Sequence, residues 1–351
     1  MTHPVSEHQH AIARFRLREK RRWQWLAFFL CLALISFVMD VATGPSMLSP
    51  GEVIRSIFNF GDRETMTDSI VRGLRLPIAL MALIVGASLG AGGAQMQTLL
   101  NNPMASPYTL GMAAAAGFGA AAMLATGGFG LNDMIAVPLG AFFFSMIAAG
   151  FLFFLASMRR TNIESIILGG IALLFLFQSL ISLIQFIASP ELSQQILFWL
   201  FGSLTKTTWP TLSITTLITF ACCILLWLDS WKLAALRMGD MRAASLGVNV
   251  RRLRIKILVI VAIMTATATS FVGVIGFIGL IAPHLARISV GEDQRFYLPM
   301  SMLSGALMLS IASVMSKIII PGALFPVGIV TAIVGVPFLL WLIFSPRRRA
   351  R

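Results

Sequence analysis

The sequence predicts an all-α polytopic membrane protein with about ten transmembrane helices, and three observations support this. Of the 351 residues, 57% are hydrophobic and 12% are charged, which is too little charge for the surface of a soluble domain. Apolar runs of about 20 residues, the length that crosses a bilayer, recur from Trp23 to Ser345. Lys and Arg residues are concentrated in every second connection between successive apolar runs, as the positive-inside rule requires. Residues 23–345 are therefore expected to form a single transmembrane domain.

The apolar runs divide into ten expected spans. They are 23–40, 76–98, 108–127, 134–156, 165–187, 209–229, 256–275, 276–290, 298–315 and 327–345. The first run is long for the core of a signal peptide and no small-residue cleavage site follows it, so we expect it to be retained. A glycine-rich break at Gly273 and Gly276 separates the seventh span from the short eighth.

The basic residues orient these spans. With the N-terminus inside, 21 of the 27 Lys and Arg residues lie in cytoplasmic segments, so residues 1–22 and 346–351 are expected to be cytoplasmic tails. The first tail, which carries His3, His8 and His10, is expected to be disordered. The net charge of +13 is then a signal of topology. A nucleic-acid partner is disfavoured, because short scattered loops offer no continuous basic groove.

Two short helices are expected outside the spans. Ser49 and Glu52 have the spacing of a capping box and Pro50 suits the first helical position, which predicts a helix at the outer membrane surface. On the cytoplasmic side, residues 238–248 contain a predicted helix from Asp240 to Leu246, with Gly247 as its C-terminal stop.

The sequence lacks the motifs of an independent enzyme. It has no G-x-x-x-x-G-K-[ST] phosphate loop, no H-E-x-x-H and no cluster of metal ligands. Cys31, Cys222 and Cys223 lie in apolar runs and are expected to be small hydrophobic residues. No Asp, Glu, Lys or Arg lies in the interior of an expected span. An ion-coupled carrier or a membrane-embedded enzyme usually needs such groups at depth, so both alternatives are disfavoured. We expect no cofactor and no metal on this chain.

Small residues mark one helix as a packing centre. Gly86, Gly90 and Ala94 share one face of the second expected span, and small residues four apart allow helices to approach closely. Packing within the chain is favoured over a dedicated dimer contact.

Four stretches resemble, in order, motifs of the FecCD family of ABC importer permeases. They are "LRLP" (74–77), "NNPMASPYTLG" (101–111), "MGDMRAASLGVNV" (238–250) and "GFIGLIAPHLAR" (276–287), and with the final apolar run the resemblance covers about 45–345. The resemblance implies a type II importer permease in the bacterial inner membrane, paired with a second protomer. Partner ATPase subunits would bind ATP and Mg²⁺, and an extracytoplasmic binding protein would deliver the cargo. A ferric siderophore is the expected cargo, with haem or cobalamin as alternatives.

The resemblance also implies roles for individual residues. The expected cytoplasmic gate comprises Asn102, Pro103, Met104, Ala105, Pro107 and Gly111, with Met104 in place of the usual leucine. The expected contact with the ATPase comprises Gly239, Asp240, Ala243, Leu246, Gly247, Val248, Pro283, His284 and Arg287. A plain turn, an ordinary helical connector and a structural cap are the respective alternatives for 101–111, 240–246 and 283–287. Met241 stands where the family has a second acidic residue.

Docking of the binding protein is expected at the outer face. The candidate residues are Arg72, Arg75, Trp199, Gly202 and Lys317, and an interfacial anchor is the alternative for Trp199. Ile78 replaces the second arginine of the family's R-L-P-R motif, and Arg72 and Lys317 are the candidates to compensate. "PGALFPVG" (321–328) also departs from the family pattern, so the outer mouth is expected to be individual to this protein.

Overall fold

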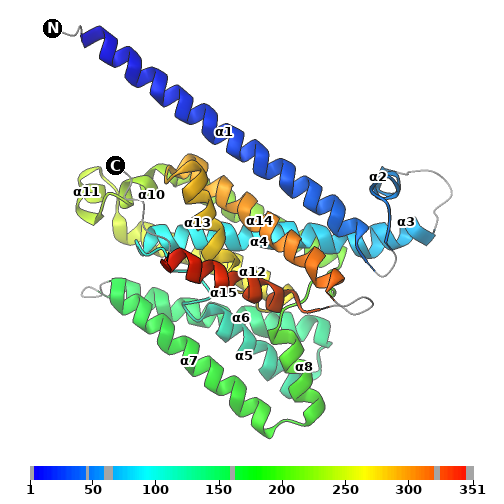
Figure 1. The fold of residues 1–351 in the computed structure, drawn as a ribbon. Helices are drawn as coiled ribbons and strands as arrows, with labels where there is room; N and C mark the ends of the chain where they lie inside the picture. The colour runs from blue at the N-terminus through cyan, green and yellow to red at the C-terminus, as the bar shows by residue number, and fades with distance from the viewer. Residues whose placement is uncertain (1–3, 45–46, 59–65, 159–162, 320–324, 345–351) are drawn as a thin grey trace.

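The computed structural model describes residues 4–44, 47–58, 66–158, 163–319 and 325–344, and within these it is a bundle of helices without strands (Figure 1). His3, the tail 346–351 and residues 321–324 of the "PGALFPVG" segment lie outside the described residues. Seven of the described helices are long and apolar enough to cross a membrane, and three shorter apolar helices accompany them.

Each expected span contains a helix. In chain order these are α1 (Pro4–Ala42), α4 (Leu76–Leu99), α5 (Met112–Ala125), α6 (Asp133–Ser157), α7 (Ile163–Ile187), α9 (Trp209–Leu228), α12 (Val250–Val272), α13 (Ile278–Val290), α14 (Gln294–Ile318) and α15 (Val327–Phe344). The fold class predicted from composition and hydropathy is therefore confirmed.

Several boundaries differ from the prediction, and α12 and α14 begin earlier than expected, at Val250 and Gln294. The helix α1 begins at Pro4, so His8 and His10 lie in a helix and not in a disordered tail. The third span was expected from residue 108, but α5 begins at Met112 because the preceding residues form turns. The break between α12 and α13 covers 273–277, since Gly273 and Phe277 both adopt positive φ.

Several short helices lie outside the spans. The sequence analysis missed α8 (Pro190–Leu200) and α10 (Ser230–Leu236), as well as α3 (Met66–Ile70) and the π-helical η1 (Val71–Arg75), which precede α4. A short 3-10 turn, η2 (Gly127–Gly130), follows α5. Ser189 caps α8 through its side chain and Pro190 follows it, a start signal that the sequence analysis overlooked.

The helix α4 lies at the centre of the bundle, where glycines let its neighbours approach to backbone contact. A Cβ atom on Gly86 would lie 2.3 Å from the Gly305 carbonyl oxygen of α14, and one on Gly90 would lie 2.2 Å from that of Ser301. A Cβ atom on Gly93 would lie 1.7 Å from the Gly279 oxygen of α13. The small-residue face of α4 therefore packs within the chain, as the sequence analysis favoured.

The remaining helices cover this centre on two sides. The helix α1 lies along α14, while α5, α6, α7 and α8 form a group on the far side of α12 (Figure 1). Within that group α5 and α6 also approach at glycines, because a Cβ atom on Gly119 would lie 2.1 Å from the Gly140 oxygen.

The two ends of the bundle carry different short helices. The helix α2 (Pro50–Phe58) and α3 lie at one end, and α10 and α11 (Asp240–Ser245) lie at the other (Figure 1). The predicted capping box of α2 is present: the Ser49 N–H donates to the Glu52 carboxylate at 2.8 Å, and the Glu52 N–H donates to the Ser49 hydroxyl at 3.3 Å. The hydrogen bond from the Ser49 backbone holds the pKa of Glu52 below its usual value.

The glycine contacts of α4 make a testable prediction. We expect Gly86→Val to lower the melting temperature of the detergent-solubilised protein, because the added side chain overlaps the α14 backbone at a cost of about 1–3 kcal/mol or more. Gly150→Val is the matched control, since Gly150 lies in α6 with nothing within 4 Å of its Cβ position. Equal melting temperatures for the two variants would contradict this packing.

Candidate functional site

The segment 101–111 between α4 and α5 is a compact series of turns held by its own polar groups. Asn101 adopts a positive φ of 43°, and the Asn102 side-chain oxygen accepts a hydrogen bond from the Met104 N–H at 2.9 Å. Further along, the Ser106 N–H donates to the Thr109 hydroxyl at 3.0 Å and the Thr109 N–H donates to the Ser106 hydroxyl at 3.2 Å. The polar but uncharged residues of this stretch therefore satisfy backbone groups where no helix can.

One half of this segment is buried in the bundle and the other half is open. Ala105, Pro107 and Gly111 are buried, whereas Pro103 and Met104 are exposed. A Cβ atom on Gly111 would lie 2.8 Å from the Leu174 nitrogen of α7, so this glycine is required both by contact and by its φ of 79°. The segment therefore packs against α7 at Gly111 and is exposed at Pro103 and Met104.

The buried half of the segment faces the break between α12 and α13. A Cβ atom on Gly276 would lie 3.7 Å from the Tyr108 ring, and one on Gly92 would lie 3.7 Å from the Pro107 ring. A small cavity lies between these elements and is lined by Leu89, Ser106, Pro107, Tyr108, Ala113, Thr265, Thr269, Ile275, Phe277 and Gly279. Two segments of irregular backbone therefore meet inside the bundle, where protein shields their polar groups.

A second crossing of irregular backbone holds two of the predicted docking residues. The Ser203 N–H donates to the Val272 oxygen at 2.7 Å, and a Cβ atom on Gly202 would lie 2.6 Å from the Val274 oxygen. Trp199 packs against a cluster that includes Ala116 and Ala120. Gly202 is buried against the helical break, whereas the half-buried Trp199 side chain holds α8 against α5 and α6.

The helix α11 ends in the geometry that the sequence predicted. Gly247 has a φ of 82°, the Val248 N–H donates to the Ala243 oxygen at 3.0 Å, and the Gly247 N–H donates to the Ala244 oxygen at 2.9 Å. These two bonds define a Schellman motif. Ala243 and Val248 are buried, and they supply the apolar contact that accompanies this motif.

The outer side of α11 exposes apolar side chains. Met241 is 85% exposed, Leu246 56% and Met238 50%. Asp240 pairs with Arg254 of α12 at 2.9 Å, which ties the start of α11 to the bundle. A short, anchored helix with an uncovered apolar side is suited to bind another protein.

The α13 residues predicted to face an ATPase are engaged within the chain. Pro283 is buried, and the His284 ring lies 6.2 Å from the Phe338 ring of α15. Arg287 pairs with Glu292 at 3.1 Å and donates to the Gln97 side-chain oxygen at 3.3 Å. These contacts are those of a structural cap, which the sequence analysis had kept open as the alternative, and the ATPase contact stays a prediction.

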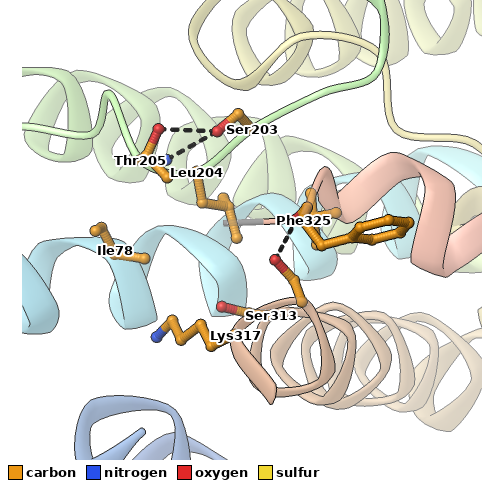
Figure 2. Close-up of a pocket in the computed structure, with 9 residues that line it drawn as sticks. Ile78, Ser203, Leu204, Thr205, Ser313, Lys317 and Phe325 are labelled. Atoms are coloured by element: carbon orange, nitrogen blue, oxygen red, sulfur yellow. Dashed lines mark hydrogen bonds between the residues drawn. The ribbon is translucent and has the colours of Figure 1, made fainter. Parts of the chain in front are cut away.

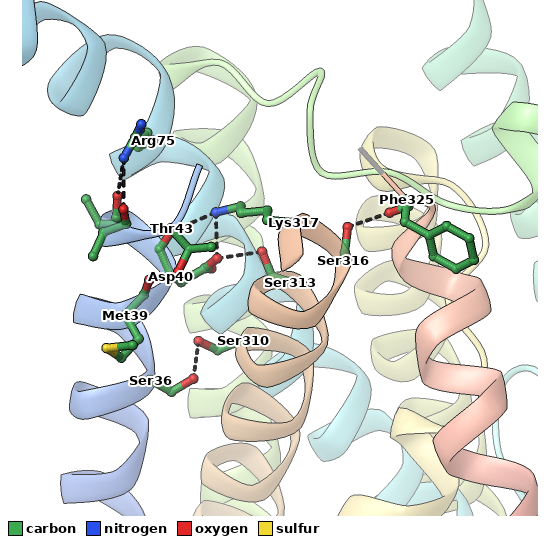
Figure 3. A network of polar contacts seen from close by, with 12 residues as sticks. Ser36, Met39, Asp40, Thr43, Arg75, Ser310, Ser313, Ser316, Lys317 and Phe325 are labelled. Atoms are coloured by element: carbon green, nitrogen blue, oxygen red, sulfur yellow. Dashed lines mark hydrogen bonds and ion pairs between the residues drawn. The ribbon is translucent and has the colours of Figure 1, made fainter. Parts of the chain in front are cut away.

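At the α2 end, two of the candidates for docking the binding protein, Arg75 and Lys317, are largely buried and not exposed at the outer face. Arg75 is 7% exposed and donates to the Val41 and Ala42 carbonyl oxygens at 3.2 and 3.1 Å, so it caps the end of α1 (Figure 3). Lys317 pairs with Asp40 at 2.6 Å, with side chains that are 10% and 0% exposed. Arg72 is half-buried and donates to the Ser56 oxygen of α2 at 2.8 Å.

Asp40 and Lys317 also qualify the expectation that the spans hold no interior charge. The helices α1 and α14 extend past the expected spans to Ala42 and Ile318, which brings the pair inside the packed bundle. Ser313 donates to the Asp40 carboxylate at 2.8 Å (Figure 3). Lys317 lines one cavity together with Ile78, as Figure 2 shows, but its ammonium is already paired with Asp40, and its compensation for the missing arginine stays a prediction.

The sequence did not predict which polar residues join distant elements. Gln97 was noted only as a polar residue within an apolar run and Glu292 was given no role, yet Gln97 is 2% exposed and Glu292 pairs with both Arg237 and Arg287. A glutamine inside an apolar run was the available signal for Gln97. Nothing in the local pattern distinguishes Glu292 from any other loop carboxylate.

Comparisons with known proteins agree on one family. The family model described as the FecCD transport family matches residues 32–345. The hemin transport system permease protein HmuU of Yersinia pestis is 33% identical over 327 residues, which cover 92% of this chain and 96% of HmuU. The Fe(3+)-citrate import system permease protein YfmE of Bacillus subtilis is 31% identical over 337 residues, or 95% of this chain and 98% of YfmE.

A solved structure shares the fold. It is an inward-facing conformation of a metal-chelate type ABC transporter, with a TM-score of 0.81 and 27% identity, and the match covers 92% of this chain and 99% of that chain.

The Asp40–Lys317 pair makes a testable prediction. Lys317→Met leaves a buried carboxylate without its partner, so we expect it to destabilise the protein by about 3–5 kcal/mol. The double variant Asp40→Asn/Lys317→Met should melt at a higher temperature than Lys317→Met alone, because neither charge then remains buried. Lys206→Met, at an exposed lysine, is the control. A melting temperature of Lys317→Met equal to that of the control would contradict the pairing.

Proposed function

The chain belongs to the FecCD transport family, and on that basis we propose that it carries an iron chelate, specifically a ferric siderophore, across the bacterial cytoplasmic membrane. It is an ABC importer permease of the FecCD type, a class of subunit that works with a separate ATPase and a binding protein. The match over nearly the whole chain carries this conclusion, because it includes every element of the candidate site.

The iron-chelate cargo rests on the relatives. YfmE is named for Fe(3+)-citrate, which is an iron chelate. Haem and cobalamin, which the family resemblance also implies, are the alternatives of the same type, and HmuU, which is named for hemin, favours haem among them. An ion-coupled carrier is the alternative of another class, and Asp40 with Lys317 is the buried charge pair that it could use. Their mutual pairing at 2.6 Å favours a structural role over ion transport.

We assign the α11 end of the bundle to the cytoplasm. Arg237, Arg242, Arg251, Arg252, Arg254 and Lys256 all lie in or beside α10, α11 and the start of α12, and such clusters remain inside. Both chain termini would then be cytoplasmic. The exposed apolar side of α11 would enter a cleft of the ATPase, which binds ATP and Mg²⁺, and the chain itself would hold no cofactor.

The segment 101–111 is then the proposed inner gate. Asn102, Pro103 and Met104 form its open half, and they would meet their counterparts in a second permease protomer. Ala105, Pro107 and Gly111 form the buried half, which would hold the gate against α7. At the opposite end, Arg72 is the proposed contact for the binding protein. Arg75, Trp199, Gly202 and Lys317 would support that surface from beneath.

Reconstitution tests the function directly. We expect proteoliposomes that contain the permease with its ATPase, supplied with the binding protein, to accumulate a ferric siderophore only when ATP is present. Parallel assays with haem and cobalamin distinguish the cargo. An ATPase variant that binds but does not hydrolyse ATP is the control. Uptake that survives in this control, driven by an ion gradient, would contradict the importer assignment.

The C-terminal stop of α11 gives a second prediction. Gly247→Val places a β-branched side chain at a φ of 82°, which costs about 1–2 kcal/mol or more and displaces α11. We expect ATP hydrolysis to continue while the amount of cargo carried for each ATP falls. Gly247→Asn is the matched variant, because asparagine tolerates this conformation, and it should retain more of the coupling. Full coupling in Gly247→Val would contradict the role of α11.

A further inference from the structure

A chain of polar contacts connects α11 to the segment 101–111 through residues that are distant in sequence. It starts at Arg237, which ends α10 three residues before Asp240, and passes through Glu292, Arg287 and Gln97. Each contact joins two different elements, so together these contacts link α10, α13 and α4. These polar contacts lie beside, and not within, the apolar contacts of α11.

Glu292 is the first junction, because its carboxylate serves two arginines. Arg237 pairs with the Glu292 carboxylate and also donates to its backbone oxygen at 3.0 Å. The Arg287 Nε lies 3.1 Å from the same carboxylate oxygen, an ion pair without hydrogen-bond geometry. The arginine side chains are only 17% and 24% exposed, whereas Glu292 is 54% exposed. One carboxylate on a short loop therefore holds α10 and α13 together.

Gln97 is the second junction, and it is buried at the end of α4. Its side-chain oxygen accepts from Arg287 at 3.3 Å and from the Tyr297 hydroxyl at 3.4 Å, and its amide donates to the Leu280 oxygen at 3.2 Å. Its backbone oxygen accepts from the Asn102 N–H at 3.2 Å. Gln97 thus joins α13 and α14 directly to the first turn of the segment 101–111.

The Tyr297 ring supports both arginines. The Arg237 and Arg287 guanidinium carbons lie 5.7 and 6.0 Å from its centre, and Tyr297 is fully buried. Stacking on a fixed ring restricts the guanidinium groups, so a displacement of Arg237 is passed on and not absorbed by side-chain freedom. The hydrogen bonds at Gln97 operate in a low dielectric, which strengthens them.

We propose that Arg237, Glu292, Arg287 and Gln97 form a relay that transmits the movement of α11 to the segment 101–111. The proposal rests on the proposed function, in which α11 receives the push of the ATPase and 101–111 is the gate. The four are positioning residues, since each of them would act through its neighbours. Removing one link leaves both ends intact but lets them move independently.

The experiment measures cargo uptake and ATP hydrolysis in the same proteoliposomes. In Glu292→Gln and in Gln97→Met we expect uptake per ATP to fall about fivefold or more, while hydrolysis stays within about twofold of the wild-type rate. Glu292→Asp keeps the carboxylate and should recover most of the uptake. The double variant should lose no more than the worse single variant, because both lie on one path.

Two matched controls separate transmission from packing. Asp293→Asn removes the neighbouring carboxylate, which pairs with Arg22 at 2.9 Å, and asparagine still caps α14. Gln95→Met removes a fully buried glutamine of the same helix, whose amide contacts Gln294. Both controls should retain the wild-type ratio of uptake to hydrolysis.

Three results would overturn the relay. Wild-type coupling in Glu292→Gln would do so, and its surface position keeps that variant informative even if Gln97→Met fails to fold. If uptake per ATP fell as far in Asp293→Asn as in Glu292→Gln, these residues would be assigned to packing alone. The same would follow if uptake and hydrolysis fell in parallel in the test variants. Absence of ATP-dependent uptake by the wild-type complex would instead overturn the proposed function, and the relay with it.

Discussion

The close approach of α4 to α14 and α13 is the constraint on which the rest of the structure depends. Three glycines of α4 face backbone carbonyl oxygens at distances that leave no room for a Cβ atom. In a bilayer, helices associate through packing and not through exclusion of water, so this contact area matters more than it would in a soluble protein. With α4 fixed against two neighbours, both of its ends acquire defined positions. One end carries Arg75 and the other carries Gln97 and the turns that follow.

This packing also explains where irregular backbone is tolerated. The break at 273–277, the turns at 101–111 and the segment after α8 all lie against one another or against helices. Hydrogen bonds in turns, from capping side chains and between segments, such as that from Ser203 to Val272, engage polar groups of these segments. A membrane protein can place non-helical backbone inside only under this condition. Such segments can rearrange with smaller losses than a continuous helix can, which suits them to a gate.

The two ends of the bundle are built differently. At the α2 end, Asp40, Lys317 and Arg75 are buried and hold helix ends together. At the α11 end, Met241 and Leu246 are exposed, and polar side chains lead from Arg237 towards the interior. The family membership and the charge distribution give these ends their proposed orientation.

The sequence by itself determined the helices of the ten expected spans, the short α11 with its glycine stop, the capping box of α2 and the family. These features depend on local signals, namely apolar run length, residue preference at caps and motif order, and a single chain displays them. Only the tertiary structure decided which polar side chains pair. Gln97 and Arg287 are separated by 190 residues and Asp40 and Lys317 by 277, and no local pattern encodes such partners. It likewise placed Arg75 and Lys317 inside the bundle, because burial depends on how helices pack and not on the charge of one residue.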